Sequence, residues 1–392
     1  MTAKQVQQDV SWQDPEPFHV EAQGQSLTFY PRGQDRLDAL IELIDGAQET
    51  LHAFYYMYAE DEAGTRVRDA LVRAAGRGVD VILFVDGFGS DVKDEFFEPL
   101  RAAGGRFDKF LAKWSRRYLI RNHQKLAIAD RKRAMIGGFN VEKAYFAEPQ
   151  DDGWHDLGLR VEGSAVDQLV RWYEEIDDWV GTPKAQFRNI VRKVNEWDSG
   201  KGPVRLLIGG PTRGLSSWAR CIQSDLAEGK HLDMVMAYFS PPNKVLRRIG
   251  DIASRGEARL VQAGKSDNGA TVGATRSLYH YLLKRGAQIW EFTPCKLHMK
   301  MVVLDDAVYL GSANFDMRSL YVNLELMLRI EDAGLADRMR QFIDAHREAS
   351  NVITKESHRR KATLWNRVRW NLSWFLVAVV DYNVARRLNL GL

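Results

Sequence analysis

The sequence has very little cysteine. Its 392 residues include only Cys221 and Cys295. Two thiols cannot build a disulfide framework, and they are too few for a cysteine metal site. The composition therefore suits a reducing compartment, where structural disulfides are rare.

Long apolar runs are also missing. No stretch reaches the ~20 predominantly apolar residues that a membrane-spanning helix requires. The opening residues, MTAKQVQQDVSWQDPEP, lack the basic, apolar and small-residue regions of a secretory signal. We therefore expect a cytoplasmic protein that reaches any membrane from its surface.

Neither sign of charge is in excess. Lysine and arginine total 55, aspartate and glutamate total 52, and the formal net charge is +3. Nucleic-acid-binding domains usually carry a clear basic surplus, so nucleic acid is not the expected partner. The chain length exceeds what one hydrophobic core usually organises, which predicts two domains of roughly 150 to 200 residues.

A histidine–lysine motif is present twice. Residues 122–140 read NHQKLAIADRKRAMIGGFN, and residues 297–314 read LHMKMVVLDDAVYLGSAN. His123 and Lys125 of the first copy correspond to His298 and Lys300 of the second, 175 positions later (298 minus 123). Because positions i and i+2 of a strand share a face, each histidine and its lysine are expected to point the same way.

The surroundings of the two motifs repeat as well. Each is preceded by an aromatic strand, a helix ending in Arg-Gly, a second strand, another helix and a short strand, an order typical of α/β folds. We therefore predict two similar α/β domains related by pseudo-twofold symmetry, with the active site at their interface. The expected divisions are a first domain at 1–180, a connection at 181–203, a second domain at 204–361 and an aromatic, basic segment at 362–392.

The residues of the motifs favour an anion over a metal ion. Two histidines are good metal ligands, but a charged lysine on the same face in both copies repels a divalent cation and has no lone pair to offer. Glycine lets backbone approach a ligand closely, and asparagine donates hydrogen bonds. We expect a phosphodiester to be held without a metal or cofactor by Lys125, Lys300, Gly138, Ser312, Asn140 and Asn314.

Four carboxylates accompany the motifs. Asp130 and Asp305 lie seven positions after their histidines, on the other strand face or past the strand end, so a turn or backbone-capping role is favoured. Asp156 in GWHDLGLRVEG and Glu325 in VNLELMLRI lie in the strand after each motif. We expect them to hold the second ring nitrogen of a histidine, the alternative being exposed charges at strand starts.

Two histidines at one phosphodiester suggest a covalent mechanism. One neutral imidazole attacks phosphorus and forms a phosphohistidine, while the other, protonated, passes its proton to the leaving alcohol. An incoming alcohol or water, deprotonated by the second histidine, then releases the product. The lysines and asparagines stabilise the charge on the non-bridging oxygens.

The doubled pattern resembles the paired H-x-K-x-x-x-x-D signature of the phospholipase D superfamily. GSANFDMRSLYVNLE, WHDLGLRVEG and VDGFGS resemble more narrowly the bacterial cardiolipin synthases, in particular the shorter forms without N-terminal transmembrane helices. The resemblance implies transfer of a phosphatidyl group from one phospholipid to phosphatidylglycerol, with phosphatidylglycerol or phosphatidylethanolamine as the donor. It also implies peripheral attachment to the inner face of the cell membrane. The catalytic residues it implies are His123 as nucleophile, His298 as acid and base, Lys125, Lys300, Asp130 and Asp305.

Other functions share these residues. A phospholipase D-type hydrolase of lipid, or less readily of nucleic acid, differs only in whether water or a lipid alcohol reaches the adduct. A catalytically silent membrane-bound scaffold is the alternative from another class, but it predicts decay of the motif. Every histidine, lysine, aspartate and asparagine of the pattern is present in both copies.

Two segments mix aromatic and basic residues as membrane-interface segments do. The first is FLAKWSRRYLIRN at 110–122, and the second is the C-terminal segment at 362–392 with its short apolar run. Ordinary surface loops, or packing against the chain's own domains, are the alternatives. The residues expected to contact a membrane are Trp114, Arg116, Arg117, Trp370, Trp374 and Phe375.

Overall fold

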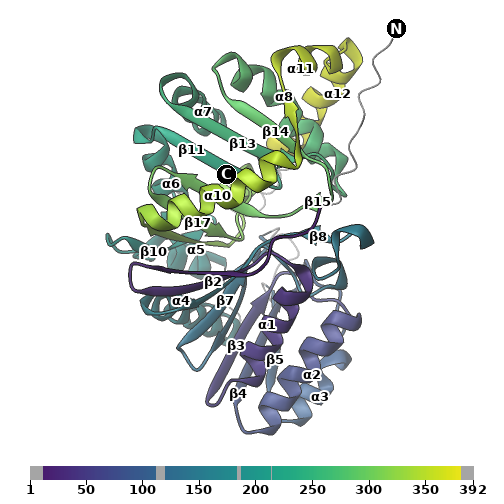
Figure 1. Ribbon diagram of the computed structural model, residues 1–392. Helices are drawn as coiled ribbons and strands as arrows, with labels where there is room; N and C mark the ends of the chain where they lie inside the picture. Colours follow the sequence, from purple (N-terminus) through teal and green to yellow (C-terminus); the bar gives the residue numbers. More distant parts are fainter. Residues whose placement is uncertain (1–11, 112–119, 183–186, 213, 381–392) are drawn as a thin grey trace.

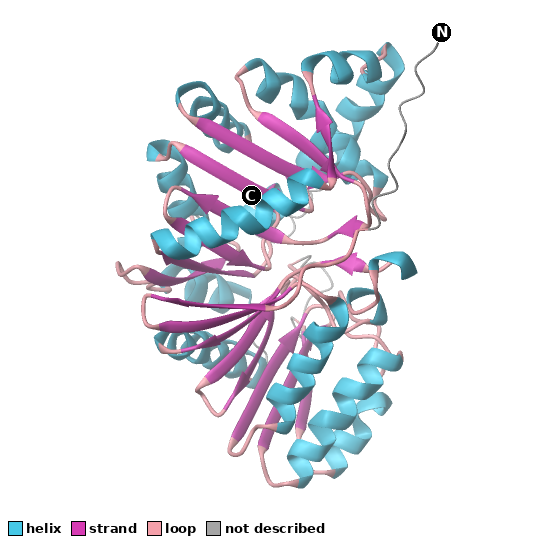
Figure 2. Cartoon of the chain, viewed as in Figure 1, coloured by secondary structure: helices cyan, strands magenta, loops and turns pink. Residues whose placement is uncertain are grey.

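A computed structural model of the protein describes residues 12–111, 120–182, 187–212 and 214–380. Two sheets, each covered by helices, lie one above the other and meet along a central interface (Figure 1). Helices line the outer flank of each sheet, and further helices lie beside the interface (Figure 2). The predicted class, two similar α/β domains, is confirmed.

The N-terminal sheet has eight strands in the order β1-β2-β9-β7-β6-β3-β4-β5. Strands β3, β4 and β5 run parallel, and the remaining neighbours pair antiparallel. The strands of this domain are β1 Phe18–Ala22, β2 Gln25–Tyr30, β3 Thr50–Tyr55, β4 Asp80–Asp86, β5 Arg106–Phe110, β6 Lys125–Ala129, β7 Arg133–Gly137, β8 Trp154–His155 and β9 Gly158–Glu162.

The C-terminal sheet also has eight strands, in the order β10-β19-β17-β16-β11-β13-β14-β20. The small strands β12 and β18 pair with each other, and β15 pairs with β8 of the first domain. The strands of this domain are β10 Val204–Gly209, β11 His231–Met236, β12 Phe239–Ser240, β13 Glu257–Ala263, β14 Gln288–Phe292, β15 Lys296–Leu297, β16 Lys300–Leu304, β17 Ala307–Gly311, β18 Phe315–Asp316, β19 Glu325–Glu331 and β20 Ser350–Ile353.

The two sheets repeat one arrangement. The run β2-β9-β7-β6-β3-β4-β5 has the same spatial order as β10-β19-β17-β16-β11-β13-β14, strand for strand along the chain. Only the additions differ, since β1 extends one edge of the first sheet and β20 extends the opposite edge of the second. The sequence repeat is therefore a structural repeat, and both motif strands, β6 and β16, occupy equivalent central positions.

The helices divide between the outer and inner faces of the sheets. Helices α1, α2 and α3 pack on the outside of the first sheet, and α6, α7 and α8 on the outside of the second. Helices α4 and α10 contribute to the core between the sheets. The principal helices are α1 Gly33–Asp45, α2 Glu62–Gly76, α3 Glu98–Ala102, α4 Ser164–Gly181, α5 Phe187–Glu196, α6 Ser217–Glu228, α7 Asn243–Arg255, α8 Gly269–Lys284, α9 Met317–Tyr321, α10 Ala333–Glu348, α11 Lys355–Lys361 and α12 Leu364–Trp374.

Both faces of each sheet are buried, as the continuous apolar strands require. In β4, for example, Leu83 faces the outer helices, whereas Ile82 and Phe84 join the core between the two sheets. That central core contains residues of both domains. Ile190 and Val194 of α5 are buried in it, so the connecting segment packs at the interface. Because apolar area buried this way is removed from water, docking of the two sheets is strongly favoured.

The C-terminal segment folds back on the second domain. Helix α12 packs against α8 and continues into a short π-helix, Phe375–Val380. Among the described residues, no helix combines the length and apolar character needed to cross a membrane.

Candidate active site

Each motif histidine lies just before its strand and is bonded to the other domain. Asn122 forms a parallel bridge with Leu324, and the backbone N–H of His123 donates to the Leu324 carbonyl at 2.8 Å. In the second copy β15 pairs with β8, and the N–H of His298 donates to the His155 carbonyl at 2.8 Å. The two motifs therefore meet at the interface through equivalent, crossed backbone bridges.

These bridges bring each histidine against a carboxylate of the opposite domain. Nδ1 of His123 lies 3.1 Å from Oε2 of Glu325, and Nδ1 of His298 lies 2.6 Å from Oδ2 of Asp156. The sequence placed one carboxylate after each motif but did not reveal this exchange between domains. In both pairs the contact occupies Nδ1, so a substrate would meet the other ring nitrogen. In His298 that nitrogen also lies 3.0 Å from Nζ of Lys300 and 3.5 Å from the Tyr145 hydroxyl.

Both motif lysines are buried beside the histidines. Nζ of Lys125 donates to the His123 carbonyl at 2.5 Å. Nζ of Lys300 donates to the His298 carbonyl and lies 2.7 and 3.0 Å from the two ring nitrogens of His298. Each lysine lowers the pKa of both histidines. The four side chains thus share one electrostatic environment, although they come from two domains.

The histidines are held in their neutral form. Burial, together with the Lys300 ammonium, lowers the pKa of His298 to about 3. Burial, and then the ammoniums of Lys125 and Lys300, lowers the pKa of His123 well below its ordinary value. A neutral imidazole keeps a lone pair, as a nucleophile or general base requires.

Burial acts in opposite directions on the pKa values of the carboxylates and of the lysines. Burial raises the pKa of Glu325 to about 7 and lowers the pKa of Lys300 to about 8. Burial also acts to raise the pKa of Asp156, but Lys300 and His298 outweigh it and hold that pKa below its usual value. Because a bound phosphodiester carries negative charge, it would favour the charged forms of the lysines and histidines.

The two motif asparagines are buried near the ends of β7 and β17. Oδ1 of Asn140 accepts a hydrogen bond from the Met57 N–H at 3.2 Å. Oδ1 of Asn314 has no hydrogen-bond partner within the described residues. An amide end without a partner is costly when buried, so Asn314 has capacity for a ligand that Asn140 partly lacks.

Gly138 and Ser312, which were expected to hold phosphate, lie against the two carboxylates. A Cβ at Gly138 would lie 2.7 Å from both carboxylate oxygens of Asp156, so glycine makes room for that side chain. At the equivalent position Oγ of Ser312 donates to Glu325 at 2.5 Å, and the Ser312 N–H is bonded to the Leu326 carbonyl. Both positions therefore support the carboxylates that orient the histidines.

The motif aspartates lie away from the chemistry, in the hairpins that follow β6 and β16. The Asp130 carboxylate accepts the backbone N–H groups of Gln48, Glu49 and Thr50 at 2.8 to 3.2 Å. Asp305 accepts those of Lys230 and His231 at 3.1 and 2.9 Å. The catalytic role implied by the family resemblance is thus corrected to the capping role that their spacing favoured.

The hairpins also explain a difference between the copies. Ala129 pairs with Arg133, which leaves a three-residue loop, whereas Leu304 pairs with Ala307, which leaves a two-residue loop. The second motif is shorter by this one residue, and the site is unaffected.

The residues expected to contact a membrane differ in how much of each is exposed. Trp114, Arg116 and Arg117 lie outside the described residues. Trp370 is buried and stacks on His358, which contradicts a membrane contact, because its indole packs against its own domain. Trp374 is half-buried against the same domain, whereas Phe375 is 49% exposed.

The sequence analysis missed Arg36. This side chain is fully buried in α1, and its guanidinium donates to the carbonyls of Tyr30, Pro31, Asp156 and Tyr145 at 2.6 to 3.2 Å. It thereby fixes the backbone at Asp156. An arginine on the buried face of an amphipathic helix was the available signal, since unpaired buried charge is rare.

Asp86 in VDGFGS has a role that the sequence did not indicate. Its buried carboxylate accepts the N–H groups of Asn122, Phe88 and Gly89 at 2.7 to 2.8 Å. Asn122 immediately precedes His123, so Asp86 anchors the turn that presents the first histidine. Burial raises the pKa of Asp86 to about 6.

A second buried pair of histidines lies directly behind Asp156. Nδ1 of His346 donates to the Phe342 carbonyl at 2.7 Å, and its Nε2 lies 2.6 Å from Nε2 of His155. Burial lowers the pKa of His346 to about 3, so His346 accepts and His155 donates. Nδ1 of His155 lies 2.8 Å from Asp14. This cluster joins the N-terminal segment, β8 and α10 beside the bridge that positions His298.

Comparison with known proteins places this geometry in a family. A family model described as "Cardiolipin synthase, PLD-like domain" matches residues 40–176 and 221–347, which include both motif histidines. The chain therefore belongs to the cardiolipin synthase family of phospholipase D-like domains.

Individual relatives agree with this assignment. Cardiolipin synthase 1 of Bacillus anthracis is 28% identical over 338 residues, which are 82% of this chain and 66% of the relative. The major cardiolipin synthase ClsA of Bacillus subtilis is 28% identical over 378 residues, 92% of this chain and 77% of the relative. This chain thus spans slightly less than two thirds of the length of the Bacillus anthracis protein.

The fold itself is shared with a solved structure. The crystal structure of phosphatidylserine synthase from Haemophilus influenzae matches with a TM-score of 0.73 at 15% identity, over 94% of this chain and 96% of that one. Within the described residues, no group of three or more histidine, cysteine, aspartate or glutamate side chains is arranged to hold a metal ion.

The crossed carboxylates generate a first prediction. Asp156→Asn and Glu325→Gln should each lower kcat at least about 10²-fold, because an amide no longer stabilises the required ring tautomer and the imidazolium. KM should change little. Steady-state kinetics on a phosphodiester substrate measures this, with Asp225→Asn as a control carboxylate outside the site. Unchanged kcat in both amide variants would remove the orienting role.

The capping aspartates generate a second. Asp130→Ala should lower the free energy of unfolding by about 2 to 3 kcal/mol, because three backbone N–H groups lose a charged acceptor. The kcat of the folded protein should stay within a few-fold of wild type. Denaturant unfolding combined with active-site-normalised kinetics separates the two effects. A loss of kcat without a loss of stability would restore Asp130 to the catalytic group.

The shifted pKa values generate a third. Glu325 loses its charge as pH falls through about 7, and Lys300 loses its charge as pH rises through about 8. Since kcat/KM reports the free enzyme, its pH profile should be bell-shaped between these limbs. Glu325→Gln should remove the acid limb of the profile, and the maximum kcat/KM of this variant should be lower than that of wild type. A wild-type profile that is flat from about pH 6 to pH 9 would contradict this assignment of charges. This range extends on each side of the two pKa values by the ~1 unit over which pKa values in proteins usually vary.

Proposed function

We propose that the protein is a phosphatidyltransferase that forms cardiolipin from phosphatidylglycerol and a second phospholipid. The observation that carries the proposal is the pair of neutral histidines, each held by a carboxylate of the opposite domain, around two buried lysines. Membership of the cardiolipin synthase family supplies the substrate class. The fold shared with a phosphatidylserine synthase agrees with phosphatidyl transfer.

In the proposed first step His123 attacks the phosphorus of the donor lipid. A bond forms between its free ring nitrogen and phosphorus, and the bond to the headgroup oxygen breaks. Protonated His298 gives its proton to that oxygen, so glycerol leaves when phosphatidylglycerol is the donor and ethanolamine when phosphatidylethanolamine is. Lys125 and Lys300 stabilise the charge on the non-bridging oxygens.

In the proposed second step the glycerol hydroxyl of phosphatidylglycerol attacks the phosphohistidine. His298, now neutral, takes the hydroxyl proton, and the phosphorus–nitrogen bond breaks to release cardiolipin and free His123. The assignment of His123 as nucleophile is supported by its greater access, since 13% of its side chain is exposed against 5% for His298. We propose that Asn314, whose amide oxygen has no hydrogen-bond partner among the described residues, accepts a hydrogen bond from a substrate hydroxyl.

Contact with a bilayer is part of the proposal. Phospholipid substrates reside in a membrane, and Phe375 belongs to an exposed apolar surface at the C-terminal end of the described chain. We infer that the protein works as a peripheral enzyme on the inner surface of the cell membrane.

Lipid products test the proposal. Purified protein incubated with labelled phosphatidylglycerol, with or without phosphatidylethanolamine and in the presence of a chelator, should produce cardiolipin. His123→Ala and His298→Ala should each lower turnover by at least about 10⁴-fold, because both act in both steps. Phosphatidic acid without cardiolipin would identify a hydrolase, and restoration of a chelated enzyme only by zinc would overturn the metal-free mechanism.

Trapping the intermediate tests the roles. Acid hydrolyses phosphohistidine, so the reaction should be quenched in base and the labelled residue located by peptide mapping. The label should be found on His123, and His298→Ala should accumulate it from a donor with a good leaving group. Label on His298 instead would exchange the two roles while leaving the reaction class intact.

A further inference from the structure

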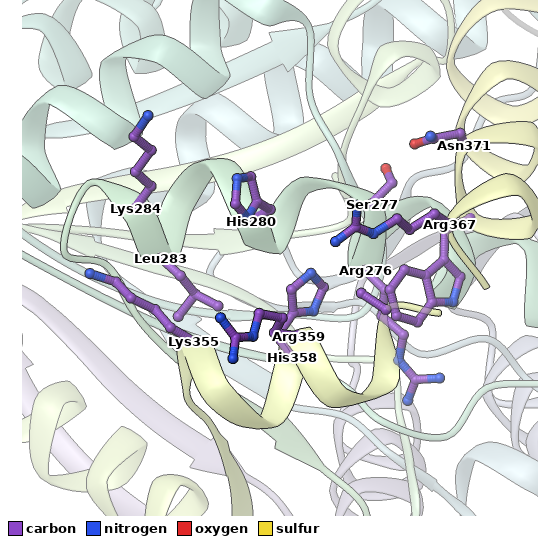
Figure 3. Close-up of a pocket in the computed structure, with 12 residues that line it drawn as sticks. Arg276, Ser277, His280, Leu283, Lys284, Lys355, His358, Arg359, Arg367 and Asn371 are labelled. Atoms are coloured by element: carbon purple, nitrogen blue, oxygen red, sulfur yellow. The ribbon is translucent and has the colours of Figure 1, made fainter. Parts of the chain in front are cut away.

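A basic pocket lies on the C-terminal domain, where α8, α11 and α12 meet. Its volume is about 410 Å³, which suits a small ligand or a lipid headgroup. Lys355, His358 and Arg359 project from α11 on one side, and His280 lies on α8 on the other (Figure 3). Helices α11 and α12 lie at the outer end of this domain, away from the interface between the sheets (Figure 1).

Most of the positive charge in this pocket is uncompensated. Arg276 is already held by Glu291, at 2.7 and 2.8 Å. The remaining lining cations make no ion pair with an acidic side chain in the part of the chain that the structure describes. They are Lys284, Lys355, Arg359 and Arg367.

The nearby acidic and titratable groups offset only part of this charge. The Glu356 carboxylate is engaged chiefly by its own backbone and the Thr354 side chain, attracts Lys355 and Arg359 more weakly, and does not line the pocket. Burial lowers the pKa of His358, and His280 and Arg367 lower it further. The cations that line the cavity thus outnumber the acidic groups beside it, and an anion would reduce their mutual repulsion.

An exposed apolar stripe runs along α12 beside the pocket. Leu364 is 81% exposed, Trp365 75% and Leu372 55%. With Val368 between them, spacings of three, four, seven and eight positions place them on one side of the helix. The stripe, defined here as Leu364, Trp365, Val368, Leu372, Phe375 and Leu376, has no covering residues among those described.

The opposite side of α12 is fixed to the domain. The Trp370 ring stacks on His358 at 5.4 Å between centroids, and a Cβ at Gly273 of α8 would lie 2.7 Å from Oγ of Ser373. Glycine is thus required for the close approach of the two helices. Because α12 is fixed in this way, the pocket and the stripe are parts of one rigid surface.

We propose that this pocket is a second phosphate-binding site, separate from the active site, which holds the headgroup of an anionic phospholipid in the bilayer while the stripe lies among the acyl chains. Cations next to exposed apolar and aromatic side chains match the boundary between headgroups and acyl chains. A free phosphate ion would use the cations alone and leave the stripe in water. The proposal rests on the proposed function only for the choice of a membrane, and it does not require turnover.

Vesicle binding tests the site with a matched pair of variants. Lys355→Ala with Arg359→Ala removes two cations that line the pocket, whereas Arg360→Ala with Lys361→Ala removes two from the same helix that do not. Full-length protein is sedimented with vesicles of phosphatidylcholine alone, or of phosphatidylcholine and phosphatidylglycerol in equal parts. The pocket pair should weaken binding to the anionic vesicles at least about 10-fold and the control pair no more than about 3-fold, since a specific contact exceeds general surface attraction.

A second pair of substitutions tests the apolar stripe in the same vesicle-binding experiment. Trp365→Ser with Leu372→Ser should also weaken vesicle binding by at least about 10-fold, since both side chains would leave the acyl region. Thermal unfolding of every variant should match wild type, because all the substituted side chains are exposed. Turnover of a short-chain, monomeric phosphatidylglycerol should be unchanged in the pocket pair.

Several outcomes would overturn the proposal. Equal losses for the pocket and control pairs would show general electrostatic attraction without a site. Inorganic phosphate that binds wild type but not the pocket pair, with unchanged vesicle affinity, would identify a soluble anion as the ligand. Dimerisation in solution that Trp365→Ser abolishes would show that a second copy covers the stripe. If short-chain lipid is not turned over but the vesicle contrast holds, the proposed function fails and this site stands.

Discussion

The site depends on two crossed backbone bridges between the domains. Each motif enters its strand through a residue that pairs with the chain of the other domain, Asn122 with Leu324 and Leu297 with His155. One position further on, each histidine therefore faces the carboxylate that follows the paired residue. Neither domain alone contains an oriented histidine. The apolar core between the sheets supplies the free energy that keeps these bridges in register, since backbone hydrogen bonds alone contribute little net stability.

Once the bridges are formed, the electrostatics follow from burial. Two lysines and two histidines are removed from water, and isolated buried charge is costly. The counter-charges of the lysines are the carboxylates of Asp156 and Glu325, with Asp86 near Lys125 and Asp316 near Lys300. The protein reduces that cost by keeping both imidazoles neutral and lowering the pKa of Lys300. In the proposed reaction an incoming phosphodiester would reverse this balance. The substrate anion would then complete the charge of the site and couple its own binding to protonation of the acid that the leaving group needs.

The sequence predicted those features of the fold that depend on repeated elements and on the alternation of residues along a strand. The strand and helix order, the shared face of His123 and Lys125, and the turn role of Asp130 all follow from local periodicity. The exchange of Asp156 and Glu325 between domains does not, because a local pattern cannot report which strand ends abut after docking. Composition misled at Trp370, whose aromatic and basic sequence neighbours resemble a membrane-interface segment although the indole stacks on His358. Arg36 was visible as a charge on an apolar helix face, but its four carbonyl partners come from three separate loops.

The duplication does not make the two halves equivalent. Position 138 is glycine beneath Asp156, whereas position 312 is a serine that donates to Glu325. In its own domain Asp156 accepts instead from the backbone N–H of Leu157, at 2.8 Å. Asp156 stays ionised against His298 at 2.6 Å, whereas Glu325, with a pKa of about 7, faces His123 at 3.1 Å. An ionised partner favours an imidazole that must accept and return a proton, which suits an acid and base. A partner that is only partly ionised gives weaker support to positive charge, which suits the ring that stays neutral until it attacks. In the proposed mechanism, these unequal surroundings would let two equal motifs take different chemical roles.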